Sequence, residues 1–265
     1  MSTEAVLAEF DDGIATITLN QPDRMNALSD DIKRGLESAL DAVEERDDVR
    51  CLVLQGNGTA FCAGGDVGGM GDRDESDRTS RDRIKDLVDL CEQVPIRIYE
   101  ADVPTVAKID GYCVGAGVGL ALSCDLQLAS DDASFGLVFR NVGLSLDLAT
   151  SFLVPRAVGW NVAKELALTG EIIDADRAEA LGLINHAYPS DEFEREATEL
   201  IDTVATGPTV ALEQSLRNID RSYGGTIREA SEREAQAQNI AFETADHREG
   251  VAAFGEDREP EFQGR

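Results

Sequence analysis

Residues 56–66 read Gly-Asn-Gly-Thr-Ala-Phe-Cys-Ala-Gly-Gly-Asp, and a second glycine-rich stretch, Gly-Tyr-Cys-Val-Gly-Ala-Gly-Val-Gly, occupies residues 111–119. Each follows a short apolar run, residues 51–54 and 106–109, that predicts a buried strand. A helical pattern that ends near Cys124 follows the second stretch. Glycine lets the backbone turn tightly and approach a ligand closely. This order of strand, glycine turn and helix predicts an α/β chain.

The two glycine-rich stretches also indicate a chemistry. Amides at the start of a helix lack intrahelical acceptors and point outward, so two such loops side by side can present two donors to one oxygen, as an oxyanion hole does. For either stretch alone, an ordinary strand-to-helix turn is the alternative. A dinucleotide site is excluded, because Leu120 stands where G-x-G-x-x-G needs its third glycine, and no P-loop sequence occurs.

On the N-terminal side, alternating apolar residues at 6–10 and 14–19 predict a hairpin whose turn is Asp11-Asp12-Gly13. Ser29 predicts the N-cap of a helix that continues to about Arg46. Short strands and helices therefore surround the glycine loops, as an α/β core requires.

On the C-terminal side of residues 56–66, the charged and small residues 71–83 predict an exposed, mobile segment, and a long helix is expected from there to about Tyr99. From Asp191 onward no strand pattern returns, and four helices are expected. We therefore expect an α/β core over residues 1–190. A C-terminal helical region over residues 191–265 is expected to pack on the core or on another subunit.

The charge of the chain excludes several classes of partner. Its 265 residues carry 52 Asp and Glu against 24 Lys and Arg, a net charge of −28. A nucleic-acid clamp needs a basic footprint, and an anionic membrane surface attracts basic segments. With 42% hydrophobic residues the chain is not disordered. So acidic a surface indicates a salt-rich cytosol, where salt screens self-repulsion.

The sequence also indicates a compartment. No signal-peptide pattern or run of 18 apolar residues is visible, so no membrane span is expected. The five cysteines form no C-x-x-C pair and are expected to be buried, reduced thiols. We expect a cytoplasmic location.

Six collinear motifs resemble those of the crotonase (enoyl-CoA hydratase/isomerase) superfamily. Arg24-Met25-Asn26-Ala27-Leu28 resembles its early CoA-contacting motif, and residues 61–66 and 111–117 resemble its two oxyanion loops. Three further motifs also fall where that family has them: Pro155-Arg156-x-x-Gly159, Ala178-x-x-Leu181-Gly182-Leu183-Ile184 and Glu249-Gly250-Val251-Ala252-Ala253-Phe254.

The resemblance implies a repeated ββα spiral core followed by a C-terminal helical region. It also implies a homotrimer or a hexamer, and an acyl-CoA thioester substrate with no cofactor beyond the coenzyme A that the substrate carries. By position, the backbone N–H groups of Gly65 and Ala116 would hold the thioester oxygen as it becomes an enolate. The substrate-binding positions that the resemblance implies are Arg24, Met25, Ala27, Ala63, Gly64, Asp66, Val67, Phe139 and Leu144.

The chain departs from the family at the acid–base positions. Members that add water typically use two Glu, and Gly119 and Phe139 stand at those positions here. Residues 143–151 resemble a G-L-x-P-D-x-G-x-S stretch, with Leu146 in place of Pro, in which the Asp moves the proton in related isomerases. That Asp is Asp147, a carboxylate among leucines whose apolar setting would favour the neutral acid. The alternative is that Asp147 caps the following helix.

A single carboxylate can remove a proton at one carbon and return it at another, whereas hydration usually needs a second group to activate water. Double-bond isomerisation of an enoyl-CoA is therefore the leading hypothesis. Hydration and a non-catalytic acyl-CoA-binding role are the alternatives.

The sequence lacks the residues that other catalytic chemistries would need. The only histidines, His186 and His247, adjoin no nucleophile motif and are expected at the surface, and no metal-ligand spacing occurs. A lysine that the family often places near the CoA phosphates corresponds to Asp257. Arg258 beside it is a candidate substitute, and Arg24 is the better one, since a guanidinium binds phosphate through two parallel hydrogen bonds.

Overall fold

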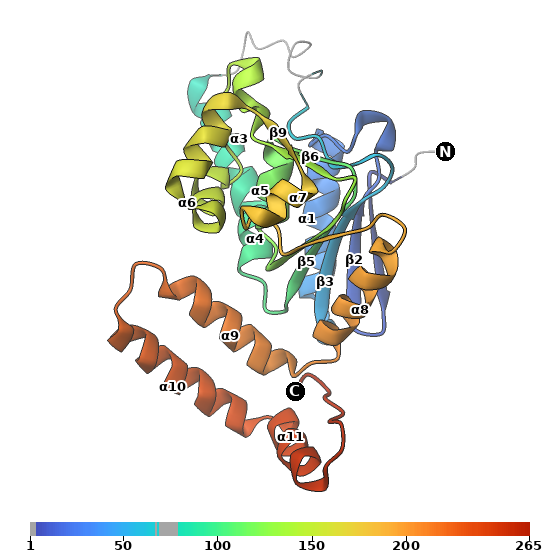
Figure 1. Ribbon diagram of the computed structural model, residues 1–265, viewed down its shortest axis with the longest axis vertical. Helices are drawn as coiled ribbons and strands as arrows, with labels where there is room; N and C mark the ends of the chain where they lie inside the picture. Colours follow the sequence, from blue (N-terminus) through green and yellow to red (C-terminus); the bar gives the residue numbers. More distant parts are fainter. Residues whose placement is uncertain (1–3, 67, 69–78) are drawn as a thin grey trace.

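The computed structural model describes residues 4–66, 68 and 79–265, and within them ten strands form two sheets (Figure 1). The larger sheet has the order β1-β2-β3-β5-β7-β10 and the smaller one β4-β6-β8-β9. The strands are β1 Val6–Asp11, β2 Ile14–Leu19, β3 Cys51–Gly56, β4 Ala60–Cys62, β5 Thr105–Ile109, β6 Tyr112–Val114, β7 Leu126–Ser130, β8 Ser134–Gly136, β9 Ile172–Asp174 and β10 His186–Tyr188.

The chain winds between the two sheets in a spiral. Strands β3, β5 and β7 run parallel in the larger sheet, and each is followed directly by β4, β6 or β8, which run parallel in the smaller one. Each turn of the spiral therefore contributes one strand to each sheet. This confirms the expected α/β class and the repeated ββ units of the core.

The first hairpin is confirmed as well. β1 and β2 pair antiparallel with Asp11 opposite Ile14, and Asp12 and Gly13 both have positive φ. Two positive φ values are the signature of the tight turn that matches the twist of paired strands.

The helices surround this spiral. They are α1 Asp30–Glu44, α3 Ser80–Gln93, α4 Pro95–Tyr99, α5 Ala116–Leu122, α6 Thr150–Thr169, α7 Ala175–Ala180, α8 Phe193–Ala205, α9 Thr209–Ser222, α10 Ile227–Glu243 and α11 Ala245–Glu256, with single 3-10 turns at Pro22–Arg24 and Val138–Val142. Within the described ranges, no helix has the length and apolar composition to cross a membrane.

The predicted helix boundaries hold in part. Ser29 caps α1, its hydroxyl accepting the Ile32 N–H at 3.3 Å. The prediction of an exposed, mobile segment over residues 71–83 is wrong at its C-terminal end, because a capping box at Thr79 starts α3 at Ser80. Residues 71–78 lie outside the described part of the chain. The long helix expected to reach Tyr99 is broken at Val94, where Pro95 begins α4.

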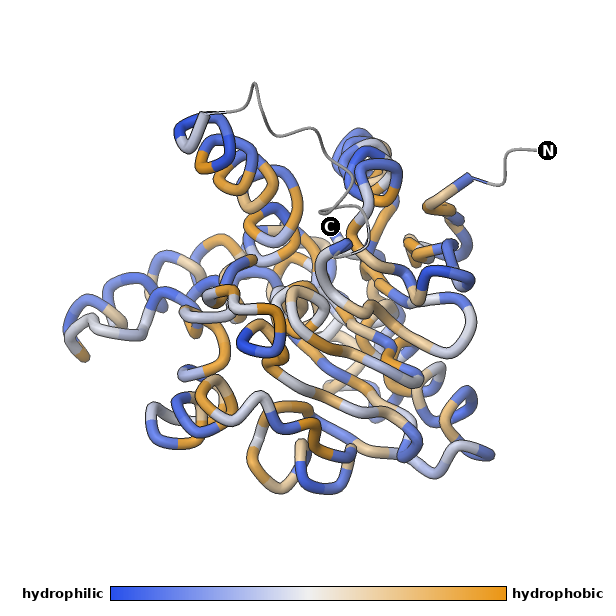
Figure 2. Tube along the Cα trace, turned by 90° about the horizontal axis from the view of Figure 1, so that it is seen from above, coloured by the Kyte–Doolittle hydropathy of each residue, from blue (hydrophilic) through white to orange (hydrophobic). Residues whose placement is uncertain are grey.

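Helix α8 covers the outer face of the larger sheet. Phe193, Ala197 and Ile201 pack against the side chains of Cys51 and Val53. Hydrophobic segments concentrate in the interior of the α/β part of the molecule, where the main core lies (Figure 2). Although α8 follows residue 190, it is therefore packed on the α/β core. The arm formed by α9, α10 and α11 extends away from that core (Figure 1).

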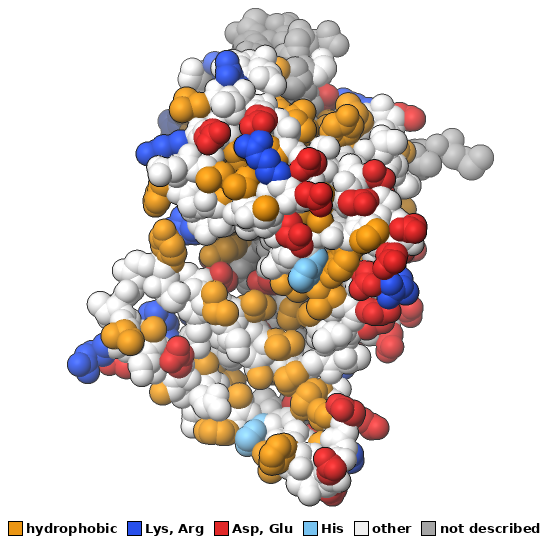
Figure 3. Space-filling view, in the orientation of Figure 1, with side chains coloured by type: hydrophobic (Ala, Val, Ile, Leu, Met, Phe, Trp, Pro, Cys, Tyr) orange, Lys and Arg blue, Asp and Glu red, His pale blue; other side chains and the backbone are white. Residues whose placement is uncertain are grey.

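The C-terminal tail is hydrogen-bonded to the start of α11 in the arm. The buried Asp246 carboxylate accepts the backbone N–H groups of Gln263 and Gly264 at 2.7 and 2.8 Å. Hydrophobic side chains nevertheless remain exposed on the arm, including Ile227 at 90% and Phe254 at 91% (Figure 3).

Helix α5 packs closely on the segment before α6. A Cβ atom at Gly119 would lie 2.2 Å from the Leu148 carbonyl oxygen and 3.0 Å from Thr150 Cγ2. The first contact is with backbone, so a side chain at residue 119 would push residues 148–150 away.

We therefore predict that Gly119→Ala lowers the free energy of unfolding by about 1–3 kcal/mol, the usual cost of overpacking. Urea titration followed by circular dichroism measures it. The matched control is Gly255→Ala near the end of α11, where no atom lies within 4 Å of the added methyl. That change should raise stability by about 0.5–1 kcal/mol. Equal stability of Gly119→Ala and the wild type would contradict the packing.

Candidate active site

The first glycine loop is held beside the segment that precedes α1. The Leu28 N–H donates to the Gly64 carbonyl at 2.8 Å, the Ala63 N–H donates to the Met25 carbonyl at 3.0 Å, and Leu28 and Gly65 form a parallel bridge. The fully buried Asn26 side chain secures this arrangement, since its Nδ2 donates to the Ala60 carbonyl at 2.7 Å. Two motifs that are far apart in the sequence thus form one unit.

The second glycine loop lies directly against the first. Gly64 has φ +86°, and a Cβ atom on it would lie 2.8 Å from the Val114 carbonyl oxygen and 3.1 Å from the Ala116 nitrogen. Only glycine tolerates both that φ and that contact. The side-by-side arrangement that the sequence predicts is therefore present.

The two amides expected to bind an oxyanion are unpaired. Ala116 is the first residue of α5, so its N–H has no intrahelical acceptor. Within the described residues, no hydrogen-bond acceptor is found for the Ala116 or the Gly65 N–H. Two free donors on touching loops can bind one carbonyl oxygen, which is the chemistry of an oxyanion hole.

The cysteines of these loops are packing residues. Cys62 and Cys113 are fully buried, and burial raises the pKa of the Cys62 thiol to about 12 and that of Cys113 well above its ordinary value. Both are free thiols, as expected. A thiol with so high a pKa is not a nucleophile at neutral pH.

Asp147 is half-buried just before α6. Its Oδ1 is buried and has no hydrogen-bond partner among the described residues. Burial raises the pKa of this carboxyl above its ordinary value, and the positive charge of Lys33 opposes that shift. Burial therefore favours the neutral acid, which suits a carboxyl that both takes up and releases a proton.

The alternative that Asp147 caps α6 is wrong. The N-cap residue is Ala149, and no side chain caps this helix. The Asp147 backbone carbonyl, not its carboxylate, accepts the Thr150 N–H at 3.0 Å and the Thr150 hydroxyl at 2.7 Å. The carboxylate is left free for another role.

Helix α5 connects Asp147 to the second loop. Gly119 touches the Leu148 carbonyl and lies three residues, or about 4.5 Å along the helix axis, from Ala116. The close packing at Gly119 therefore places the segment with Asp147 beside the helix whose first amide is a candidate donor.

The remaining predicted substrate-binding residues divide into three groups. Arg24 and Asp66 form an ion pair at 2.5 Å beside the first loop, with Met25, Ala27 and Ala63 on the same unit. Leu144 is 47% exposed, whereas the Phe139 side chain is buried in the hydrophobic core. Val67 lies outside the described residues.

Two residues near Asp147 were missed by sequence reasoning. The positive charge of Lys33 on α1 opposes the rise in the pKa of the Asp147 carboxyl, and burial together with the charge of Asp147 raises the pKa of the Cys91 thiol on α3. The sequence signal that could have pointed to Lys33 is that it is one of only four lysines and lies five residues after Leu28. Cys91 is only half-buried, so the expectation of a buried thiol is wrong there.

Arg258 is not brought to the loops of its own chain. It lies just after α11 and pairs with Glu249 and Glu256. This pairing lowers the pKa of the Glu249 carboxyl to about 2.

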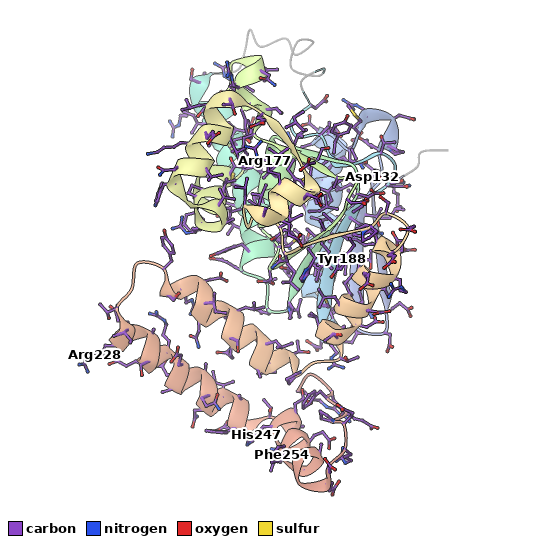
Figure 4. All side chains as sticks on the ribbon, viewed as in Figure 1. Asp132, Arg177, Tyr188, Arg228, His247 and Phe254 are labelled. Carbon is purple, nitrogen blue, oxygen red and sulfur yellow. The ribbon has the colours of Figure 1, made fainter. Side chains whose placement is uncertain are left out.

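His186 and His247 are exposed, as expected; His247 lies on α11 (Figure 4). Among residues 4–66, 68 and 79–265 there is no group of three or more side chains suited to a metal ion.

We predict that Asp147→Asn raises the melting temperature at pH 8 by roughly 2–4 °C, because it removes a poorly solvated charge. The pKa of Asp147 is raised above the unfolded value of 3.8, so the cost of its ionisation applies above the folded pKa and disappears as pH falls below both values. The gain should therefore shrink toward pH 4. Differential scanning calorimetry at several pH values measures it. The exposed Asp11→Asn is the control, and a loss of stability in Asp147→Asn at every pH would contradict the prediction.

The chain is similar to known proteins along nearly its whole length. The family model described as enoyl-CoA hydratase/isomerase matches residues 9–265. A probable enoyl-CoA hydratase of Mycobacterium tuberculosis is 31% identical over 100% of both chains, and the 1,2-epoxyphenylacetyl-CoA isomerase of Escherichia coli is 32% identical over 99% of both. The crystal structure of a putative enoyl-CoA hydratase/isomerase from Mycobacterium abscessus superimposes with a TM-score of 0.92 at 32% identity, covering 98% of this chain and 100% of that one. The spiral core, the paired glycine loops and these similarities together show that the chain belongs to the enoyl-CoA hydratase/isomerase family, the crotonase superfamily.

Proposed function

We propose that this protein isomerises the double bond of an enoyl-CoA, with Asp147 as the group that moves the proton. The Gly65 and Ala116 N–H groups hold the thioester oxygen. The Asp147 carboxylate removes a proton from one carbon, and the electron pair left behind delocalises over the double bond onto the thioester oxygen. The resulting carboxylic acid then protonates a different carbon, which shifts the double bond and restores the carboxylate.

The observation that carries this proposal is the packing at Gly119. One carboxylate of a two-Glu hydratase would have to project from this position, but the Leu148 carbonyl already lies 2.2 Å from where its Cβ would be. The second such position is Phe139, whose side chain is buried in the core. The same contact that leaves no room for a side chain at residue 119 brings in the segment with Asp147. The name of the Escherichia coli relative, 1,2-epoxyphenylacetyl-CoA isomerase, supports this choice.

Enoyl-CoA hydration is the second candidate, because other relatives of equal similarity are named hydratases. It requires a water molecule held and activated opposite the double bond. A non-catalytic acyl-CoA-binding protein is the third candidate, and it would keep the oxyanion loops without a working carboxylate.

We further propose that the protein works in the cytoplasm as a homotrimer or a hexamer and needs no cofactor beyond the substrate's coenzyme A. The reaction is redox-neutral, so no electron carrier is required. The arm supports assembly, because Ile219, Ile227, Phe242 and Phe254 expose 53–91% of their surface to solvent in one chain.

We predict that Asp147→Asn lowers kcat for double-bond migration by about 10²–10⁴-fold, the usual contribution of a general acid–base group. The variant should bind CoA esters normally, since the oxyanion amides are unchanged. Purified protein is assayed with a 3-enoyl-CoA and a phenylacetate-pathway CoA ester, and binding is measured by titration calorimetry.

Three outcomes would count against the proposal. Undiminished isomerisation by Asp147→Asn would remove Asp147 from the reaction. Rapid hydration of crotonyl-CoA by the wild type, with no isomerisation, would favour the hydratase. Tight binding of CoA esters with no turnover of any substrate would favour the non-catalytic role.

Arg24 is the proposed partner of a CoA phosphate. One of its N–H groups donates to Asp66, and its side chain is 48% exposed, so other donors of the guanidinium face solvent. We predict that Arg24→Ala raises KM for CoA esters by about tenfold, the loss of one charge-assisted hydrogen bond, and changes kcat less. Steady-state kinetics measure both. Arg34→Ala, on the exposed face of α1, is the control. An unchanged KM would remove Arg24 from the site.

A further inference from the structure

One of the six sequence motifs, Pro155-Arg156-x-x-Gly159, has no part in the proposed reaction. It lies on α6, which consists of two helical segments joined at Gly159, where φ is +78° and ψ is 162°. The first segment therefore covers residues 150–158, and Arg156 lies in its last turn, where a positive charge is favourable beside the carbonyl groups of a helix end. This short segment begins three residues after Asp147.

The first turn of this segment is joined to the backbone at Asp147. The Thr150 N–H and hydroxyl both donate to the Asp147 carbonyl, at 3.0 and 2.7 Å, and the Phe152 N–H donates to the Ala149 carbonyl at 2.8 Å. Thr150 is fully buried, whereas the Phe152 side chain is 44% exposed. The backbone at Asp147 therefore moves with the turn that carries Phe152.

Arg156 connects this turn to the arm. Its Cζ lies 3.3 Å from the centre of the Phe152 ring and 4.5 Å from the centre of the Tyr223 ring, which follows the end of α9. Its Nη1 also donates to the Phe152 carbonyl at 2.8 Å. An aromatic ring within about 6 Å attracts a cation, and the planar guanidinium stacks on such rings. Arg156 thus contacts one ring of the core and one ring of the arm.

The arm also meets the core nearer to its start. Arg50 Nη2 donates to the Gly207 carbonyl at 2.7 Å, and Arg217 of α9 pairs with Asp102. Between these contacts lies a hollow of about 460 Å³, whose lining includes Leu52 and Val103 from the core and Thr209, Val210 and Glu213 from α9. Because this hollow leaves α9 loosely packed on the core, individual contacts determine how firmly the arm is held.

We propose that Arg156 and Tyr223 are positioning residues, which fasten the arm to the first segment of α6 and thereby hold the Asp147 backbone in its catalytic place. The catalytic meaning of this contact rests on the proposed function. Neither side chain transfers a proton or touches a reacting atom. Without the Tyr223 ring, the turn that follows Asp147 loses one of the contacts that keep it closed, so it opens more often.

The test measures how often this turn opens in the full-length protein. Amide hydrogen exchange of the peptide that covers residues 147–156 is followed by mass spectrometry. The wild type is compared with Tyr223→Ala, Arg156→Ala, the double variant, Tyr223→Phe and Arg228→Ala. Tyr223 is 59% exposed, so its truncation opens no cavity in the core, and Tyr223→Phe keeps the ring. Arg228, an exposed arginine in the first turn of α10, is the matched control near the same end of the arm.

We expect exchange of residues 147–156 to be roughly two- to fivefold faster in Tyr223→Ala, the change in population that one exposed cation–π contact supports. Exchange should be unchanged in Tyr223→Phe and Arg228→Ala. Arg156→Ala should be accelerated at least as much as Tyr223→Ala, and the double variant no more than Arg156→Ala, because both changes remove the same contact.

The kinetics should separate this role from a merely structural one. In Tyr223→Ala kcat should fall while KM changes little, since the groups proposed to bind CoA lie on other segments, and Tyr223→Phe should restore kcat. Unchanged exchange in Tyr223→Ala, an equal acceleration in Arg228→Ala or additive effects in the double variant would overturn the inference. Because exchange is read without substrate, its outcome is independent of whether Asp147→Asn abolishes isomerisation, which tests the proposed function.

Discussion

The close approach of two backbone segments at Gly64 is the contact on which the candidate site depends. The first loop passes so near to the Val114 carbonyl and the Ala116 nitrogen that any side chain at residue 64 would separate the loops. The bridge from Leu28 to Gly65 holds the first loop from one side, and β6 and α5 hold the second from the other. Because the two loops follow neighbouring parallel strands of the spiral, β4 and β6, they lie side by side.

A second backbone contact, between Gly119 and Leu148, relates the carboxylate to this point. It uses the space in which a side chain at residue 119 would stand, so a carboxylate at that position and the observed path of residues 148–150 exclude each other. In the proposed reaction the acid–base group is Asp147, which lies on the other side of the contact. Burial raises the pKa of that carboxyl, and the charge of Lys33 opposes the rise.

The net charge of −28 affects how a phosphate-bearing substrate could bind. So negative a chain repels the phosphates of coenzyme A at long range, and salt screens that repulsion. In the proposed function, binding of the CoA ester therefore rests on a few placed donors. The backbone amides of Gly65 and Ala116 carry no net charge, and Arg24 has its own acidic partner in Asp66. The acidic surface therefore indicates the salt content of the surrounding solvent more than the identity of the ligand.

Local patterns were sufficient for much of this structure. The Asp12-Gly13 turn, the Ser29 cap and the two glycine loops follow from preferences of a few adjacent residues, and the motifs around them were enough to predict the family and the spiral core. What local patterns did not determine depends on long-range packing. The Asp147 carboxylate does not cap α6, the Phe139 side chain is buried in the core, and helix α8 packs on the larger sheet. Such outcomes are set by which surfaces meet in three dimensions, and no window of neighbouring residues contains that information.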